Sequence, residues 1–206
     1  MLLRYVRAVD HTMLATKIRY TFADLLTQDP ADETIYDILG GELVVFSSPN
    51  AAHAAAVARL FRYLLDAEDA GFGQARTAPF AVAFDYAERG PLAQDVTHPD
   101  LLFITSERLP IIGRQCVEAA PDLIIEILSP TTRTLDLPDG PKFAIYERYG
   151  VPHYWIVDTD ARTITQYAWS NGAYGPPVVL RPGDTLTSPL FPGLTRPVSQ
   201  IFAGLS

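Results

Sequence analysis

The stretch Ile124-Ile125-Glu126-Ile127-Leu128 decides the fold, because it is apolar on both faces apart from one acid in its middle. An apolar run of this kind is typical of a central strand that is covered on both sides. An ionised carboxylate in such a strand destabilises the fold strongly unless it is paired or binds a metal. Glu126 is therefore either half of a structural ion pair with an arginine, or a metal ligand or catalytic acid. We favour the second interpretation.

Two Pro-Asp-Leu triplets supply candidate partners for Glu126, one at Asp100 and one at Asp122. Asp122 precedes Glu126 on the same strand and lies roughly 13 Å from it at ~3.3 Å per residue, too far to share an ion. Asp100 heads a separate predicted strand, 101–104, which can lie beside Glu126. The alternative for Asp100 is a polar cap or a plain turn after His98. Asp100 is thus the predicted partner.

Lys142 is the third candidate, since the chain has 14 arginines and only two lysines, Lys17 and Lys142. A lysine ammonium is compact and has a tunable pKa, which suits the alignment of a water nucleophile. Lys142 and Tyr146 are four residues apart on a predicted helix and therefore share a face. Replacement of Lys142 by alanine is expected to abolish activity while leaving the fold largely intact. A solvated helix position is the alternative.

Three further residues have both a functional and an ordinary explanation, and a fourth, His53, has only an ordinary one. Glu42 follows the Gly40-Gly41 turn and either reaches the same site or is a surface acid at a strand start. Arg59 and Arg62 share a helix face and could meet phosphates, although such a pair is usually solvated. His53, near a helix start, is read as a helix-end contact and not as a ligand.

The order of helices and strands predicts an α/β or α+β domain without a regular βαβ repeat. A two-residue Gly40-Gly41 turn predicts a hairpin, and Asn50 and Gly71 are signals for the ends of a long helix. We expect an N-terminal extension at 1–19 and one domain at 20–206. The expected helices are 21–26, 51–67 and 138–149; the expected strands are 34–39, 42–46, 75–84, 101–104, 123–128, 153–158, 163–169 and 174–180.

Composition limits the classes of function. With 48% hydrophobic residues the chain can bury a core, which excludes a disordered protein. It has no apolar run near the ~20 residues of a membrane helix, and its single cysteine, Cys116, fits a reducing compartment, so we expect a cytoplasmic protein without a membrane partner. The net charge of −8 argues against a tight nonspecific nucleic-acid binder. Any nucleic-acid role must rest on a local patch, a metal or a second subunit.

Taken together, these residues resemble the Uma family within the PD-(D/E)XK, restriction-endonuclease-like, superfamily. The resemblance runs from about Tyr20 to Phe202. The matching pieces, in chain order, are Tyr36-Asp37, Gly41-Glu42-Leu43-Val44, Ser48-Pro49, His53, Pro99-Asp100-Leu101, Pro121-Asp122-Leu123, Glu126, Ser129-Pro130, Arg133, Asp136, Lys142, Tyr146, Gly150-Val151-Pro152 and Tyr154-Trp155-Ile156-Val157-Asp158.

The resemblance implies a mixed central β-sheet flanked by helices and a Mg²⁺ or Mn²⁺ site. Asp100, Glu126 and the backbone carbonyl of Ile127 would be ligands, with Glu42 as a helper. The lysine of the superfamily normally stands two residues after the second acid, where this chain has Leu128. Lys142 matches a position from which related proteins supply the amine instead. His153 stands where the family usually has an acid.

The resulting hypothesis is metal-assisted hydrolysis of a nucleic-acid phosphodiester, with Lys142 orienting the water or stabilising charge. The resemblance points to DNA as the substrate, and a homodimer is compatible with it. A second hypothesis is a catalytically silent relative that acts as a regulatory or binding module, which the displaced lysine and the acidic charge favour. A third is a small-molecule metallohydrolase that uses the same carboxylates.

Overall fold

The larger sheet is built around the stretch at 123–127. The computed structural model describes residues 18–29, 31, 34–45, 50–130 and 133–205. In it, β8 (Leu123–Ile127) is wholly buried and lies between β6 (Leu101–Thr105), which is antiparallel to it, and β9 (His153–Asp158), which is parallel. The two faces of β8 pack into two separate cores, one beneath each flanking helix, which explains why its sequence is apolar on both faces. The mixed sheet with flanking helices confirms the predicted fold class.

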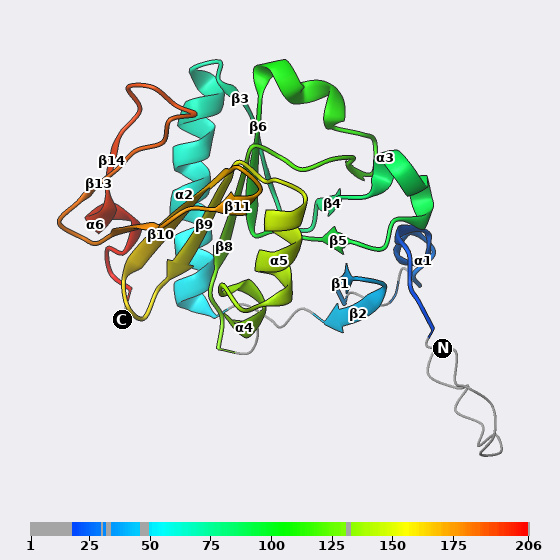
Figure 1. Cartoon of the computed structure of the whole chain (residues 1–206). Coiled ribbons are helices and arrows are strands. Elements are labelled where there is room, and N and C mark those ends of the chain that lie inside the picture. The colour runs from blue at the N-terminus through cyan, green and yellow to red at the C-terminus, as the bar shows by residue number, and fades with distance from the viewer. Residues whose placement is uncertain (1–17, 30, 32–33, 46–49, 131–132, 206) are drawn as a thin grey trace.

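The same sheet continues outward in both directions (Figure 1). Beyond β6 lies β3 (Gly73–Thr77), and beyond β9 lies β10 (Thr163–Ser170), which also pairs with β11 (Ala173–Tyr174) and β12 (Val178–Leu180). A single strand at 174–180 was predicted, but residues 175–177, Gly-Pro-Pro, separate two short ones. Proline has no N–H to donate to a strand ladder, which explains the break.

A second, smaller sheet carries the opening hairpin. Its strand order is β2 (Glu42–Val45), β1 (Tyr36–Leu39), β5 (Val96–Thr97), β4 (Ala81–Ala83) and β7 (Cys116–Val117). The Gly40-Gly41 turn is confirmed, with φ of +59° and +81°, values that glycine adopts readily. The predicted strand 75–84 is wrong: its two ends are β3 and β4, which belong to different sheets, because the chain turns around Pro79.

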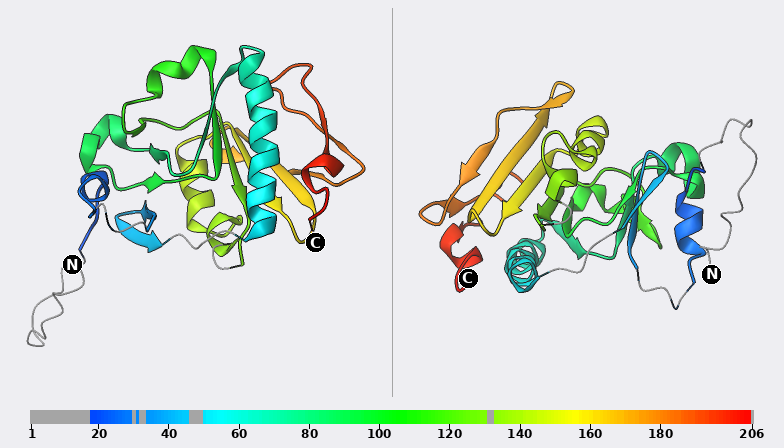
Figure 2. Two further views of the ribbon diagram at one scale, coloured as in Figure 1. Left: turned by 180° about the vertical axis from the view of Figure 1, so that it is seen from behind. Right: turned by 90° about the horizontal axis from the view of Figure 1, so that it is seen from below.

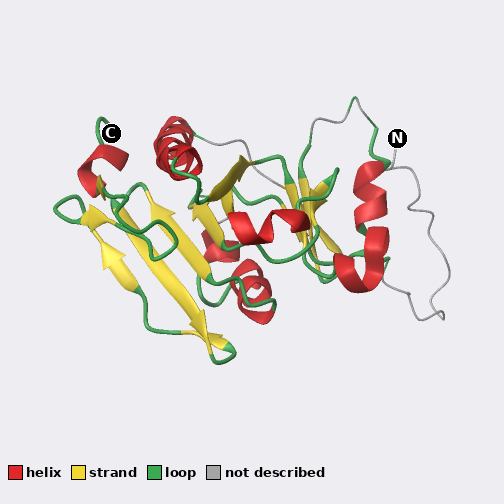
Figure 3. Ribbon diagram, turned by 90° about the horizontal axis from the view of Figure 1, so that it is seen from above, coloured by secondary structure: helices red, strands yellow, loops and turns green. Residues whose placement is uncertain are grey.

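Helices cover both faces of the larger sheet (Figures 2 and 3). On one face lies α2 (Ala51–Asp69), which begins where Asn50 accepts a hydrogen bond from the His53 amide, as predicted. On the other lies α5 (Pro141–Arg148). The helix predicted from Pro138 starts three residues later, since Gly140 is its N-cap and Pro141 its first residue. It ends before Gly150, at φ +67°.

The remaining elements are short. They are α1 (Phe22–Leu26), α3 (Tyr86–Arg89), the 3₁₀ helices η1 (Gly90–Leu92) and η2 (Ser106–Ile111), α4 (Arg133–Asp136), β13 (Thr185–Leu186), β14 (Arg196–Pro197) and α6 (Val198–Ile201). Of the predicted extension at 1–19, only Ile18 and Arg19 belong to the described residues. Within the described part of the chain, no helix combines the length and the hydropathy that membrane crossing requires.

The alternation of side chains along β8 determines where its acid points. Leu123, Ile125 and Ile127 belong to the core beneath α2, whereas Ile124 and Leu128 belong to the core beneath α5. Successive residues of a strand face opposite sides, so Glu126 lies on the α5 side of the sheet.

Candidate active site

Asp100 and Glu126 meet across two neighbouring strands. Leu101 pairs with Ile125 in the antiparallel register of β6 and β8, so one step further places Asp100 opposite Glu126 on the same side. The Asp100 amide nitrogen is 3.4 Å from Glu126 Oε2. The Asp100 carboxylate also accepts a hydrogen bond from the Ile127 amide, at 2.8 Å from Oδ2. The two acids are therefore brought together at one end of the strands.

Lys142 points from α5 into this pair of strands. Its Nζ lies 3.0 Å from Glu126 Oε1, and the side chain is almost completely buried. Tyr146, one turn later on the same helix face, donates a hydrogen bond of 2.7 Å to the same Glu126 oxygen. The predicted shared face of these two residues is thus present, and it is turned toward Glu126.

Two further acids surround the ammonium, and the sequence did not single them out as site residues. Asp37 Oδ2, from β1 of the smaller sheet, is 3.2 Å from Lys142 Nζ, and Asp136 Oδ1, from α4, is 3.7 Å away. Both acids are buried. Asp37 carries the signal that identified Glu126, namely one acid inside the strand run Ile35-Tyr36-Asp37-Ile38-Leu39.

His53 joins the cluster from the opposite face of the larger sheet. Its Nε2 lies 3.1 Å from Asp100 Oδ2, at the first turn of α2. The sequence assigned this histidine to a helix-end contact, and its backbone amide does bind the Asn50 cap. Its side chain in addition fixes the Asp100 carboxylate.

The buried charges shift one another's pKa values. Burial raises the pKa of Glu126 to about 8, and the negative charges of Asp136 and Asp100 add to this rise. The nearby ammonium of Lys142 acts in the opposite direction but does not cancel it. Burial likewise raises the pKa of Asp136 to about 6. Burial alone would also raise the pKa of Asp37, but Lys142 and His98 outweigh it and hold that pKa below its usual range.

The pKa of Lys142 moves in the direction that keeps the ammonium charged. Burial alone would lower it, but Asp37, Glu126 and Asp136 together raise it well above its usual value. Lys142 therefore keeps its proton at neutral pH.

The donor set fits a magnesium-like ion and not a cage made of side chains alone. Across the described residues, no three His, Cys, Asp or Glu side chains are grouped closely enough to hold a metal by themselves. Mg²⁺ usually takes one or two carboxylates and keeps several waters, which Asp100 and Glu126 could provide for. At Ile127 the backbone N–H contacts the Asp100 carboxylate. The carbonyl as a ligand stays a prediction.

Glu42, Arg59 and Arg62 are the remaining predicted site residues. Glu42 is exposed on β2, opposite Leu39 in the hairpin register. The Arg59 guanidinium donates a hydrogen bond of 2.9 Å to the Ile201 carbonyl of α6, and Arg62 is exposed. Both arginines follow His53 along α2, by roughly 9 and 13 Å at ~1.5 Å per residue. Their contact with nucleic acid stays a prediction.

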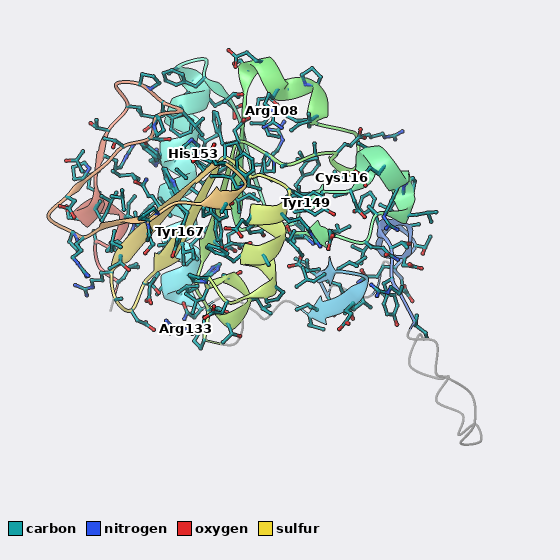
Figure 4. The ribbon with its side chains drawn as sticks, in the orientation of Figure 1. Arg108, Cys116, Arg133, Tyr149, His153 and Tyr167 are labelled. Atoms are coloured by element: carbon teal, nitrogen blue, oxygen red, sulfur yellow. The ribbon has the colours of Figure 1, made fainter. Side chains whose placement is uncertain are left out.

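Asp122, the second Pro-Asp-Leu acid, has a structural partner. It forms an ion pair of 2.8 Å with Arg108 and accepts a hydrogen bond from the Thr105 amide. In Figure 4, Arg108 lies near one end of the molecule and Arg133, which follows β8, near the other. Asp122 immediately precedes the first residue of β8, whereas Asp100 lies opposite Glu126 near the other end of that strand. This placement agrees with the predicted separation of Asp122 from Glu126.

Comparisons with known proteins bear on the family and the fold. The family model described as "Uma2: Putative restriction endonuclease" matches residues 21–199. Among solved structures, the chain is similar to a "putative nuclease belonging to DUF820" from Anabaena variabilis ATCC 29413, with a TM-score of 0.69 and 18% sequence identity over 89% of this chain and 97% of that chain. At that identity the likeness shows the fold. None of the curated proteins matches the chain.

Proposed function

Because the chain belongs to the Uma2 family of restriction-endonuclease-like proteins, we propose that it is a metal-dependent endonuclease that hydrolyses DNA phosphodiester bonds. Membership of the family supports a nuclease that acts on nucleic acid. The requirement for Mg²⁺ or Mn²⁺ and the choice of DNA are our proposals.

One observation carries the proposal. Asp100 lies just before β6, Glu126 in β8 and Lys142 in α5, and the Glu126 carboxylate contacts both the Asp100 backbone amide and the Lys142 ammonium. An ordinary structural ion pair needs one acid and one base. Here the ammonium faces three buried acids, and Asp100 lies beside one of them.

Each residue has a distinct proposed role. Asp100 and Glu126 hold the ion, with the Ile127 carbonyl as an additional ligand, and His53 and the Ile127 amide orient the Asp100 carboxylate. A bound Mg²⁺ or Mn²⁺ would supply positive charge to the phosphate and lower the pKa of a water molecule. Lys142 stays protonated, so it orients water or stabilises phosphate charge and does not act as a general base.

The two Pro-Asp-Leu triplets offer a matched test. Purified protein is incubated with supercoiled plasmid and with single-stranded DNA in Mg²⁺, in Mn²⁺ and in EDTA. We expect cleavage with either ion, its loss in Asp100→Asn and its retention in Asp122→Asn, at a temperature where circular dichroism shows both variants folded. Cleavage by folded Asp100→Asn at the wild-type rate would refute the assignment, and so would equal losses in both variants.

A specific observation also favours the silent binding module. Glu126 Oε1 is already contacted by Lys142 and Tyr146, and Asp100 Oδ2 by Ile127 and His53, which resembles a closed polar cluster. The cleavage assay, run beside a gel-retardation assay, separates the two functions. A silent relative would retard the DNA in a gel without cutting it in Mg²⁺ or in Mn²⁺.

A further inference from the structure

A cavity of about 250 Å³ lies at one end of the smaller sheet, next to α1. It forms where β1 and β4 begin and β5 ends. Side chains that line it include those of Phe22, Leu25, Tyr36, Pro79, His98 and Gln115. Gln115 is exposed, so the cavity is bordered by a residue in contact with solvent.

The chemistry of the lining favours a small, neutral, flat ligand. Among the described residues, the lining contains no Asp, Glu, Lys or Arg side chain, so it offers no permanent charge to pair with a charged ligand. It combines aromatic and aliphatic surface with the amide of Gln115, which can donate and accept hydrogen bonds, while the Gln28 amide already donates to the Thr34 carbonyl. The volume is below the ~300–1,000 Å³ of pockets for drug-sized ligands. A single heterocyclic ring system matches all three properties.

His98 connects this cavity to the acid cluster. Its ring nitrogen Nδ1 and its backbone amide lie 3.1 and 2.7 Å from Asp37 Oδ1, and the other oxygen of Asp37 is 3.2 Å from Lys142 Nζ. Along the chain, Asp100 follows His98 by two residues, or roughly 7 Å at ~3.3 Å per residue. A group held against His98 is therefore close to Asp100.

We propose that this cavity binds one unpaired nucleobase of the strand whose phosphodiester lies at the acid cluster. The inference rests on the proposed nuclease function and narrows its substrate to single-stranded nucleic acid or to a duplex from which one base is flipped out. Tyr36 supplies an aromatic surface for stacking, which tolerates any base because every base has a flat face. The neutral lining accommodates the base, while the phosphate remains at Lys142.

The test separates binding from cleavage. In EDTA, the affinity of the full chain is measured by fluorescence for 2-aminopurine riboside and for a short single-stranded DNA that contains one 2-aminopurine. Gln115→Trp places an indole at the cavity, and Tyr36→Ala removes an aromatic wall. Val178→Trp, at an exposed position on β12 of the other sheet, is the matched control.

We expect both probes to bind the wild type and Val178→Trp equally, and to bind the two cavity variants at least about fivefold more weakly, the lower limit for loss of one stacked base. Absence of riboside binding, or equal affinity in Gln115→Trp and Val178→Trp, would overturn the cavity assignment even if the protein cuts DNA. Riboside binding that Gln115→Trp weakens, in a protein that cuts no nucleic acid, would keep the base site and refute the nuclease.

Discussion

Replacement of Lys142 by methionine is the most informative change, because it removes a charge and keeps most of the side-chain volume. In the wild type the ammonium lies within 3.0–3.7 Å of carboxylate oxygens of Glu126, Asp37 and Asp136. Methionine cannot pair with any of them. Breaking a buried ion pair by removing one partner costs about 3–5 kcal/mol. For a domain of this size, at ~2–4 °C per kcal/mol, the melting temperature should fall by roughly 6–20 °C.

The destabilisation caused by Lys142→Met should depend on pH. The pKa of Glu126 is already raised to about 8 and that of Asp136 to about 6, and loss of the ammonium raises both further. At pH values between the pKa of such an acid in the unfolded chain and its higher pKa in the folded protein, the folded state binds more protons than the unfolded state. The free energy of unfolding therefore falls as pH rises. The defect of Lys142→Met should therefore be largest near pH 8 and shrink as pH falls toward 5.

The assay is thermal unfolding followed by circular dichroism, without divalent ions, at pH 5, 6.5 and 8. Arg62→Met removes an exposed charge from a helix and is the control, with an expected change within about ±0.5 kcal/mol. If Lys142→Met and Arg62→Met melted at the same temperature at pH 8, the charge cluster would not stabilise the fold in the way argued here.

Three further predictions concern the stability of the fold. Without metal, the free energy of unfolding of the wild type should fall between pH 5 and 8 by up to ~1.4 kcal/mol per pH unit, because folded Glu126 retains a proton that the unfolded chain releases. Glu126→Gln should flatten this slope in urea titrations. An unchanged slope in this variant would contradict the raised pKa of Glu126. Saturating Mg²⁺ or Mn²⁺ should stabilise the protein by ~2.7 kcal/mol at 100 times the dissociation constant, and Asp100→Asn should remove that gain; indifference of the melting curve to both ions would count against the metal site. Asp95 accepts hydrogen bonds from the Gly40 amide and the Arg148 side chain. In urea denaturation, Asp95→Ala should lower the free energy of unfolding by roughly 1–3 kcal/mol for each buried group left unpaired. Arg148→Ala, which changes an exposed side chain, should lower it by about 1 kcal/mol or less.

The parts of the fold that the sequence predicted are those with a strong local signal. β8 has an uninterrupted apolar run, the opening hairpin has Gly40-Gly41, and α2 has both an Asn50 cap and a glycine after its end. The strands β5 and β7 have only two residues each, which is too short to show a periodic pattern. Their place in the sheet is determined by the neighbouring strands. The start of α5 was placed too early because Pro138 and Pro141 are both acceptable first-turn residues, and in the structure the extended residue Gly140 caps the helix in front of Pro141.

Asp37 shows why part of the site escaped prediction. An acid in a hairpin strand is ordinarily expected on the solvent face, so Asp37 drew no site role, whereas Glu42 of the same hairpin was named as a helper, a role that stays a prediction. Asp37 lies instead on a face of β1 that α5 covers, and Lys142 on α5 supplies the counter-charge. Which side of a strand is covered depends on contacts between residues that are more than 100 positions apart in the chain.

The structure also changes what Lys142 is expected to do. From the sequence alone it was a catalytic amine whose loss would leave the fold largely intact. Its burial among Asp37, Glu126 and Asp136 gives it a structural role as well, so loss of activity in a variant at this position does not by itself identify a catalytic residue. Activity must therefore be compared in conditions where the variant is shown to be folded.

The acidic charge of the chain and the acid cluster are parts of one electrostatic argument. A protein with a net charge of −8 repels a polyanion at long range, and a cluster of ionised carboxylates would repel it at short range too. A raised pKa reduces this repulsion, since Glu126, with a pKa of about 8, is mostly protonated at neutral pH without metal. A divalent ion that displaces this proton would bring two positive charges to the position where the proposed substrate has its phosphate. Metal and substrate would then each favour the binding of the other, which is how a chain with a net charge of −8 would perform the proposed reaction on a polyanion.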